Sequence, residues 1–259
     1  MNKILTIAVF LLFSGIVKCI SQEQLNLNIE SLEVAFIKVP KGTFKMGADT
    51  TSQFFQKDEL PQTTIEITKD FYLGRTEVTQ ELWEKIMGYN PSVFRNANNP
   101  VEMVSWDDCK AFIEVLNNLW EGEGTFRLPT EAEWEYACRL GEPDYRNDQG
   151  ELVEWQLLKY AWFYSRSEGK CHPVASKAAD KMGFYDLQGS LWEWCEDWKG
   201  TYNGGFEKDP IGPVLGTHKI YRGGSWFNEP EALRPENRNA HEPHKVFSNA
   251  GLRLVYIAK

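Results

Sequence analysis

Basic residues are neither numerous nor grouped in this sequence. Its 28 lysines and arginines are outnumbered by 37 aspartates and glutamates, which gives a formal net charge of -9 at pH 7. The basic residues are scattered among acidic ones and form no concentrated run. A nucleic-acid binder needs a basic surface that neutralises phosphates, so we expect no nucleic-acid partner. Solubility is the simpler explanation for the excess of negative charge.

Long apolar stretches are also missing. The stretch from Ile4 to Val17 follows Lys3 and is shorter than the ~20 apolar residues that a transmembrane helix needs. A short cationic start, an apolar centre and small residues near its end are typical of a signal peptide. We therefore predict a signal peptide at 1–19, an exported protein (periplasmic or secreted), and no membrane span after cleavage. Lipid attachment at Cys19 is the weaker alternative, because Lys18 replaces the small apolar residue that usually precedes a lipidated cysteine.

The sequence has no CxxC pair, no fixed-period repeat, no GxSxG elbow and no glycine-rich phosphate loop. These absences argue against a structural zinc site, a solenoid or propeller, and the enzyme classes that depend on those loops. After the signal peptide four cysteines remain, which allow three disulfide connectivities. The alternative is that some are buried free thiols, since free cysteine packs as a small hydrophobic residue. The four are Cys109, Cys138, Cys171 and Cys195.

The sequence does contain enough apolar material for one large domain. Of its 259 residues, 42% are hydrophobic and 14% are aromatic. Residues 20–33 are polar with isolated leucines, which we interpret as a linker, and we place the domain at 34–259. Runs of β-branched and aromatic residues bounded by turn residues predict short strands. These strands are expected at Val34–Val39, Thr43–Met46, Thr63–Thr68, Phe71–Thr76, Lys219–Arg222 and Gly251–Tyr256.

Three helices are predicted by capping residues that precede apolar residues at helical spacing. The first follows Thr79 and ends near Gly88. The second follows Ser105, which has an acidic partner three residues on. The third follows Thr130 and ends near Gly141.

The other segments are rich in Pro, Gly, Asn and Asp, which indicates long loops. Such loops stay ordered only when something ties them down, and large buried aromatic side chains can do so. We therefore interpret Trp192 and Trp194 as core residues, with a ligand-stacking surface as the alternative. The order of elements predicts an α+β domain with few helices, small antiparallel sheets and extensive loops.

A set of short motifs runs through the chain. They are GTFKMG at Gly42–Gly47, EVT at Glu77–Thr79, PVEMVSW at Pro100–Trp106, RLPTEAEWEYA at Arg127–Ala137, GFYDL at Gly183–Leu187, LWEW at Leu191–Trp194, RGGSW at Arg222–Trp226 and GLR at Gly251–Arg253. Together they resemble the formylglycine-generating enzyme, or sulfatase-modifying factor, family over about Val34 to Val255. The RLPTEAEWEYA string is highly specific on its own.

The resemblance implies a fold related to C-type lectins, in agreement with the loop-rich prediction. It also implies that some members bind structural calcium around a G-N-x-W-E-W turn, where this sequence has Ser190 in place of the asparagine. Glu193 could supply a carboxylate to calcium, and loop carbonyls could complete the shell. The alternative is that Glu193 pairs with a nearby arginine or a backbone amide.

The oxidases of this family hold copper with two cysteines soon after the RGGSW motif, because thiolates are soft donors suited to Cu(I). The first of these positions reads Asn228 here, and no cysteine follows Cys195. Copper is therefore not expected as a cofactor, whereas structural calcium is a cofactor that the resemblance implies for some members. The groove near this motif has as candidate ligand-binding residues Ser225, Trp226, Asn228, Arg234 and Arg238.

Histidine offers one other candidate metal site. His241 and His244 are three residues apart and flank Glu242, and such a pair could share a metal if it lay on a helix. Pro243 separates them in a segment that we predict to be a loop, so solvated loop histidines are the alternative.

Two functions from different classes follow. The first is an exported, non-oxidase module that binds a protein, peptide or glycan partner on the scaffold of the enzyme family. The second is a formylglycine-generating or related metal-dependent oxidase that acts on a protein or small thiol substrate. The first rests on complete structural motifs combined with missing thiolates, and the second rests on resemblance alone.

Overall fold

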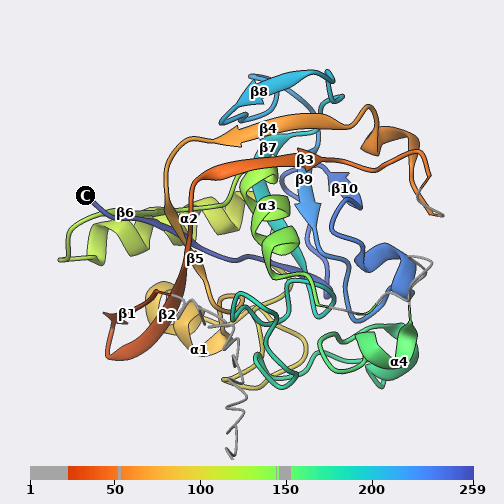
Figure 1. Ribbon diagram of the computed structural model, residues 1–259. Coiled ribbons are helices and arrows are strands. Elements are labelled where there is room, and N and C mark those ends of the chain that lie inside the picture. Colours follow the sequence, from red (N-terminus) through yellow and green to blue (C-terminus); the bar gives the residue numbers. More distant parts are fainter. Residues whose placement is uncertain (1–22, 52–53, 144, 146–152) are drawn as a thin grey trace, which may run out of the picture.

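A computed structural model describes residues 23–51, 54–143, 145 and 153–259. Over these ranges three small sheets, four short α-helices and long connecting loops pack around each other (Figure 1). The predicted signal peptide at 1–19 lies outside the described residues. Among the described residues no helix is both long and apolar enough to cross a bilayer.

The largest sheet has five strands and is antiparallel throughout. In spatial order they are β1 (Gln24–Ile29), β2 (Leu32–Val39), β5 (Phe71–Gly74), β12 (Val255–Ile257) and β6 (Thr125–Arg127). β1 pairs with β2 along its whole length, so the linker prediction for 20–33 is wrong for the residues that the structure describes. The isolated leucines of this segment alternate with polar residues and give β1 one partly buried face.

The other two sheets contain one parallel pairing each. The four-stranded sheet has the order β10 (Arg238–His241), β9 (Lys219–Arg222), β7 (Trp192–Trp198) and β11 (Ala250–Gly251), with β11 parallel to β7. The three-stranded sheet has the order β3 (Gly42–Met46), β4 (Thr63–Ile67) and β8 (Phe206–Lys208), with β8 parallel to β4. The predicted strand Gly251–Tyr256 is therefore two strands in different sheets, β11 and β12.

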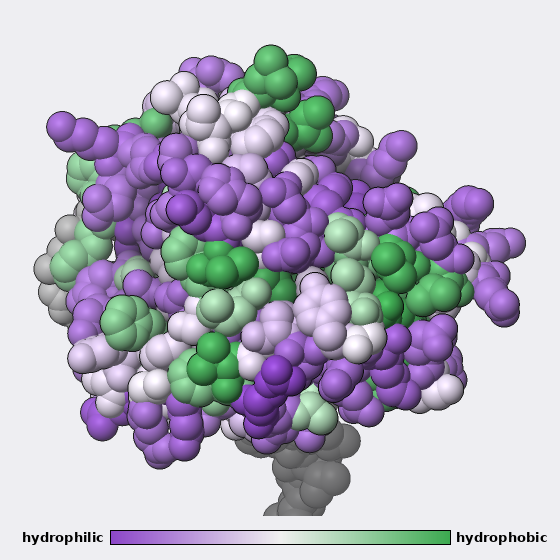
Figure 2. Space-filling model, turned by 180° about the vertical axis from the view of Figure 1, so that it is seen from behind, coloured by the Kyte–Doolittle hydropathy of each residue, from purple (hydrophilic) through white to green (hydrophobic). Residues whose placement is uncertain are grey.

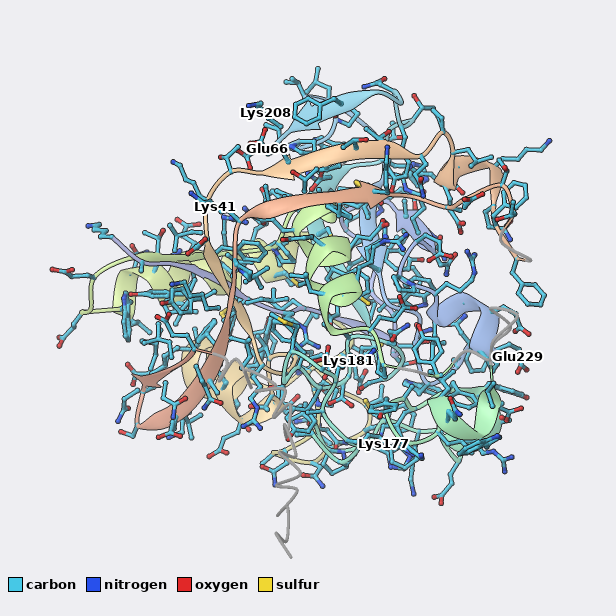
Figure 3. All side chains as sticks on the ribbon, in the orientation of Figure 1. Lys41, Glu66, Lys177, Lys181, Lys208 and Glu229 are labelled. Atoms are coloured by element: carbon cyan, nitrogen blue, oxygen red, sulfur yellow. The ribbon has the colours of Figure 1, made fainter. Side chains whose placement is uncertain are left out.

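An ion pair joins the two parallel strands of the three-stranded sheet. Lys208 Nζ on β8 lies 2.9 Å from Glu66 Oε2 on β4, and Figure 3 labels both side chains at the top of the molecule. The Lys208 side chain is 62% exposed, so this pair is a surface feature.

All three predicted helices are confirmed. They are α1 (Gln80–Met87), α2 (Trp106–Leu119) and α3 (Glu131–Gly141), and a fourth, α4 (Glu154–Leu157), has a single turn. Thr79 caps α1, and Gly88 ends it in the left-handed conformation at φ 76°. Ser105 and Thr130 each form a complete capping box at the start of α2 and α3.

Tryptophan side chains fill much of the core. Trp192 is 4% exposed and Trp194 is fully buried, which confirms their interpretation as core residues. The Trp194 indole N–H donates to the Val104 carbonyl at 3.1 Å, so the buried ring keeps its hydrogen bond. Not every tryptophan is buried, since Trp155 is 61% exposed.

Candidate functional site

The first turns of α3 place two carboxylates against arginines from β9 and β10. Glu131 accepts hydrogen bonds from Arg222 Nη1 at 2.6 Å and from Arg238 Nε and Nη2 at 2.8 and 2.6 Å. Glu135 accepts one from Arg222 Nη2 at 2.6 Å. None of the four side chains is more than 5% exposed. This network ties α3 to two strands and explains why the helix begins inside the protein.

Arg234 is held in the same way. Its Nη2 and Nη1 lie 2.7 and 2.9 Å from the two oxygens of Glu59, and Nη1 also contacts Glu236 at 3.2 Å. The Arg234 side chain is 3% exposed. Two of the five candidate groove residues, Arg234 and Arg238, are therefore bound to carboxylates inside the protein rather than free to receive a ligand.

The other three candidate groove residues lie together. Ser225 Oγ donates to Asn228 Oδ1 at 2.6 Å and accepts from Asn249 Nδ2 at 3.0 Å. The Asn228 carbonyl accepts the Tyr164 N–H at 2.9 Å. Trp226 is 7% exposed. Its backbone N–H donates to the Ser190 carbonyl at 2.7 Å, and its indole N–H donates to the Ser248 carbonyl at 3.3 Å. Asn228 thus uses its side chain and backbone to fix this loop, in which the resemblance implies a copper-binding cysteine for the oxidases.

Two exposed aromatic side chains flank this loop. Tyr164 is 53% exposed and Phe227 is 58% exposed, and their ring centres lie 5.7 Å apart with the planes nearly perpendicular. The motif position of Phe227, between Trp226 and Asn228, could have drawn attention to it in the sequence. Tyr164 carries no local signal, because it reaches Asn228 across a long separation in the chain.

The four cysteines of the described residues are free and buried. Burial raises the pKa of every one of these thiols, so each is held in the protonated form. The buried free-thiol alternative is confirmed for Cys109, Cys138, Cys171 and Cys195, and no disulfide joins any two of them.

The carboxylate of Glu193 is fully occupied. Arg253 Nη2 donates to Oε1 at 2.7 Å, Arg253 Nε lies 3.0 Å from both oxygens, and Trp134 Nε1 donates to Oε2 at 2.7 Å. The arginine pairing left open by the sequence is therefore present. Calcium at this turn stays a prediction, but Glu193 has no oxygen without a donor to offer it.

Two neighbouring acids that the sequence analysis missed do have such oxygens. Glu77 is 2% exposed and neither of its side-chain oxygens has a hydrogen-bond partner of normal geometry, although Ser190 lies beside it. Asp186 is 4% exposed and its Oδ1 is also without a partner, while Oδ2 accepts the Ala175 N–H at 2.8 Å. Burial, followed by the charge of Asp186, raises the pKa of Glu77 well above its usual range. Both acids lie in motifs quoted above, EVT and GFYDL, but only the folded environment marks them as unusual.

The two histidines of the candidate metal site have different surroundings, and a metal ion shared between them stays a prediction. The His241 ring lies beside the Glu242 carboxylate and packs against Phe247 at 4.9 Å between ring centres. His218 lies 6.1 Å from His241 by the same measure, and His244 is exposed. In the part of the chain that the structure describes, no three His, Cys, Asp or Glu side chains are grouped to hold a metal ion.

Comparison with known proteins identifies the family. Residues 24–258 match the family described as the sulfatase-modifying factor enzyme 1-like domain. The chain belongs to this family. It is 34% identical over 195 residues to the formylglycine-generating enzyme of Thermomonospora curvata, covering 67% of this chain and 60% of that protein. It is 31% identical over 187 residues to the mouse enzyme, covering 67% of this chain and 48% of that protein.

The chain is also similar to proteins with other names. The chain is 27% identical over 232 residues to the chaperone protein LppX of Paenibacillus barcinonensis, covering 72% of this chain and 80% of that protein. Treponema denticola variable protein 1 superimposes with a TM-score of 0.78 at 28% identity, covering 90% and 98% of the two chains. PvdO from Pseudomonas aeruginosa, at TM-score 0.75 and 24% identity over 86% and 94%, shares the fold. The predicted C-type-lectin-like architecture of the sulfatase-modifying-factor type is thus confirmed.

Proposed function

We propose that this chain is a non-oxidase binding module built on the sulfatase-modifying factor scaffold. The observation that carries the proposal is the state of the loop after the RGGSW motif. Asn228 stands where a family oxidase has a copper-binding sulfur, and it is hydrogen-bonded to Ser225 and Tyr164. An amide oxygen is a hard donor and a poor ligand for Cu(I), which prefers thiolates.

The remaining thiols do not offer a substitute donor set. The four described cysteines are each buried, and burial raises their pKa values and disfavours the thiolate. A copper ion at any of them would need both deprotonation and access from solvent. This supports a function that needs no redox centre.

The recognition surface that we propose is the aromatic pair Tyr164 and Phe227. Both rings are more than half exposed and lie directly beside the Ser225–Asn228 contact. Exposed aromatic groups next to hydrogen-bonding side chains suit a peptide or glycan partner, since one ring face takes apolar contact while amides and hydroxyls fix orientation. Names such as chaperone protein LppX among the relatives are in keeping with roles other than oxidation.

Export and calcium complete the proposal. The cationic start and apolar stretch before residue 19 support a cleaved signal peptide, which mass measurement of the mature chain would test. We also propose structural calcium beside the Gly189–Trp194 turn, with Glu77 and Asp186 as carboxylate ligands and backbone carbonyls completing the shell. Three buried carboxylate oxygens without partners support it, because such groups call for a cation or a donor.

The decisive experiment asks whether the purified protein changes a sulfatase-type Cys-x-Pro-x-Arg peptide in the presence of copper and oxygen. The peptide mass should stay unchanged, whereas conversion of the thiol to an aldehyde would lower it by ~18 Da and contradict the proposal, which rests on the need for thiolates. The enzyme of Thermomonospora curvata serves as the positive control. Metal analysis should find no stoichiometric copper or iron. Tight one-to-one metal binding that is lost when His241 and His244 are replaced would favour the oxidase alternative.

The binding surface has its own test. Wild-type protein and Phe227→Ala are applied to the same glycan array and peptide library. Phe206→Ala is the matched control, because Phe206 is 56% exposed, nearly as much as Phe227 at 58%, and lies on β8. Ligands that bind the wild type and the control but not Phe227→Ala support the surface. Ligands that bind all three proteins equally exclude it.

A further inference from the structure

A cavity of about 440 Å³ lies away from the aromatic pair. Its lining includes Met46 on β3, Ile65 on β4, Ala132 on α3 and Trp198 on β7, and the loop 210–213 completes it. Ser225, Trp226 and Asn228 do not line it. The size falls within the range of small-molecule binding sites, and the lining combines these apolar side chains with polar and charged ones.

One buried carboxyl group opens into this cavity. Asp197 on β7 is 4% exposed, and its Oδ2 accepts the Glu131 N–H at 2.8 Å. Its Oδ1 accepts no hydrogen bond from any residue that the structure describes. Gly212, at φ 69°, passes close by, and a Cβ there would come within 3.0 Å of Asp197 Cβ and 3.2 Å of Oδ1. A larger residue at 212 would cover the oxygen, so glycine keeps it accessible.

The other charges at the cavity do not supply a partner for Asp197. Glu131 is balanced by Arg222 and Arg238, as described above. The remaining guanidinium nitrogen of Arg238 donates to the carbonyls of Asp58 and Gly200 at 2.9 and 2.8 Å. Glu207 also lies in the lining, and among the described residues its side chain accepts a hydrogen bond from Asn203 Nδ2 at 2.9 Å and forms no ion pair. Of the three acids in the described lining, Asp197 and Glu207 thus have no cationic side chain as a partner, and the one lining arginine, Arg238, is paired.

We propose that this cavity binds a guanidinium or ammonium group carried on an apolar stem, with Asp197 as its charge partner. The apolar side chains of the lining, such as Met46 and Ile65, suit methylene groups. A charge-assisted hydrogen bond to a buried carboxylate is stronger than one between neutral groups. The proposal is independent of the function proposed above, because an oxidase of this fold could hold the same cavity.

The surface beside the cavity favours an arginine or lysine side chain of a peptide as the source of the cation. The adjoining loop carries three apolar side chains at the surface, Ile211 at 67%, Val214 at 88% and Leu215 at 84% exposure. The space-filling view shows an apolar patch at the top of the molecule, the end where Figure 1 places β8 (Figure 2). Residues next to the basic one in a peptide could pack on this loop, which a small free cation would leave uncovered.

The protonation of Asp197 gives the binding a pH signature. Burial, and then the charge of Glu131, raise the pKa of Asp197 to about 8. A cation favours the ionised carboxylate, so affinity should rise with pH as the proton becomes easier to remove. The titratable groups that interact with Asp197 are Glu131 and Glu133 on α3, Cys195 and Glu196 on β7, and Lys219 on β9.

Calorimetric titration of the whole protein with three probes tests the proposal. They are acetyl-Leu-Arg-Leu-amide, the same peptide with neutral citrulline in place of arginine, and agmatine as a free cation. The arginine peptide should bind about tenfold or more tightly than the citrulline peptide, the effect of one charged hydrogen bond. Its affinity should be higher at pH 8.5 than at pH 6. Asp197→Asn, which keeps an acceptor for the Glu131 N–H, should lower it by a similar factor, while the exposed Glu114→Gln should not.

The remaining outcomes either distinguish a peptide from a free small cation as the ligand or contradict the proposal. Agmatine binding as tight as the peptide would identify a free small cation as the ligand of the same site. Equal affinity for the arginine and citrulline peptides would overturn the proposal, as would the absence of binding by either cation at millimolar concentration. If Asp197→Asn does not fold, Gly212→Ala repeats the test, because its Cβ would lie within 3.2 Å of Asp197 Oδ1 and cover that oxygen. An unchanged affinity of this variant for the arginine peptide then counts against the proposal.

Discussion

Arg253 and Glu193 form an ion pair 2.7 Å long in which neither side chain has any exposed surface. Glu193 lies on β7 of the four-stranded sheet, and Arg253 lies in the segment between β11 and β12. Arg253 Nη1 also donates to the carbonyl of Gly74 on β5 at 2.9 Å. The pair therefore fixes the four-stranded sheet to the five-stranded one.

Removing one partner of this pair should be costly. Arg253→Met leaves a buried carboxylate with no cation, and we expect a loss of about 3–5 kcal/mol in the free energy of unfolding. Urea denaturation measures it. The matched control is Lys208→Met in the exposed pair with Glu66, which should cost less than about 1 kcal/mol. Similar losses for both variants would contradict the assignment of Arg253 as a buried structural cation.

The buried thiols should be inert in the folded protein. Because burial raises the pKa values of all four, they should not react with a maleimide at pH 7 to 9 and should react fully in denaturant. Using a Cys19→Ser variant restricts the count to Cys109, Cys138, Cys171 and Cys195. Rapid labelling of any of them under native conditions, detected by mass spectrometry, would contradict the described packing.

Calcium should stabilise the domain if Glu77 and Asp186 hold it. Saturating calcium is expected to raise the melting temperature by about 5 °C or more, since ligand binding to the folded state adds to its stability. The measurement is a thermal melt in calcium against one in chelator. Glu77→Gln and Asp186→Asn should abolish the shift, whereas Glu114→Gln should keep it. A wild-type protein that melts at the same temperature in both conditions would exclude the site.

Asp197 should make the protein less stable as pH rises. Its pKa of about 8 in the folded state lies above its ordinary value of 3.8, so the folded state holds an extra proton between those two pH values. Stability therefore falls across that window, by at most about 1.4 kcal/mol per pH unit for one group. In Asp197→Asn this dependence is absent, so its stability relative to the wild type should improve from pH 5 to pH 8 in urea unfolding. A constant difference would show that Asp197 stays ionised throughout.

Much of the fold was predictable because its signals are local. Thr79, Ser105 and Thr130 each cap a helix by accepting a hydrogen bond from the residue three positions further on, and the helices follow directly. β1 was not predicted as a strand, because only alternate residues of Gln24–Ile29 are apolar. A polar strand with one covered face resembles a linker in sequence until its partner strand is known. The split of Gly251–Tyr256 between two sheets likewise depends on partners far along the chain.

The candidate site was less predictable, because it depends on side-chain partners. Arg234 and Arg238 were predicted to share a groove with Ser225 because they lie near it in the sequence. In the structure they are bound by Glu59 and Glu131, which are more than one hundred residues away in the chain. The absence of the two cysteines after the RGGSW motif could be recognised from the sequence alone. Whether a buried acid such as Asp197 has a free oxygen becomes visible only when the surrounding structure is complete.

The position of β12 has a consequence for how this domain is made. β12 lies between β5 and β6, so it pairs with two strands that are synthesised long before it. The central gap of the largest sheet stays open until residue 257 has left the ribosome. Folding of this sheet should therefore finish only after translation of the whole domain, and a nascent chain stopped before Val255 should remain sensitive to protease.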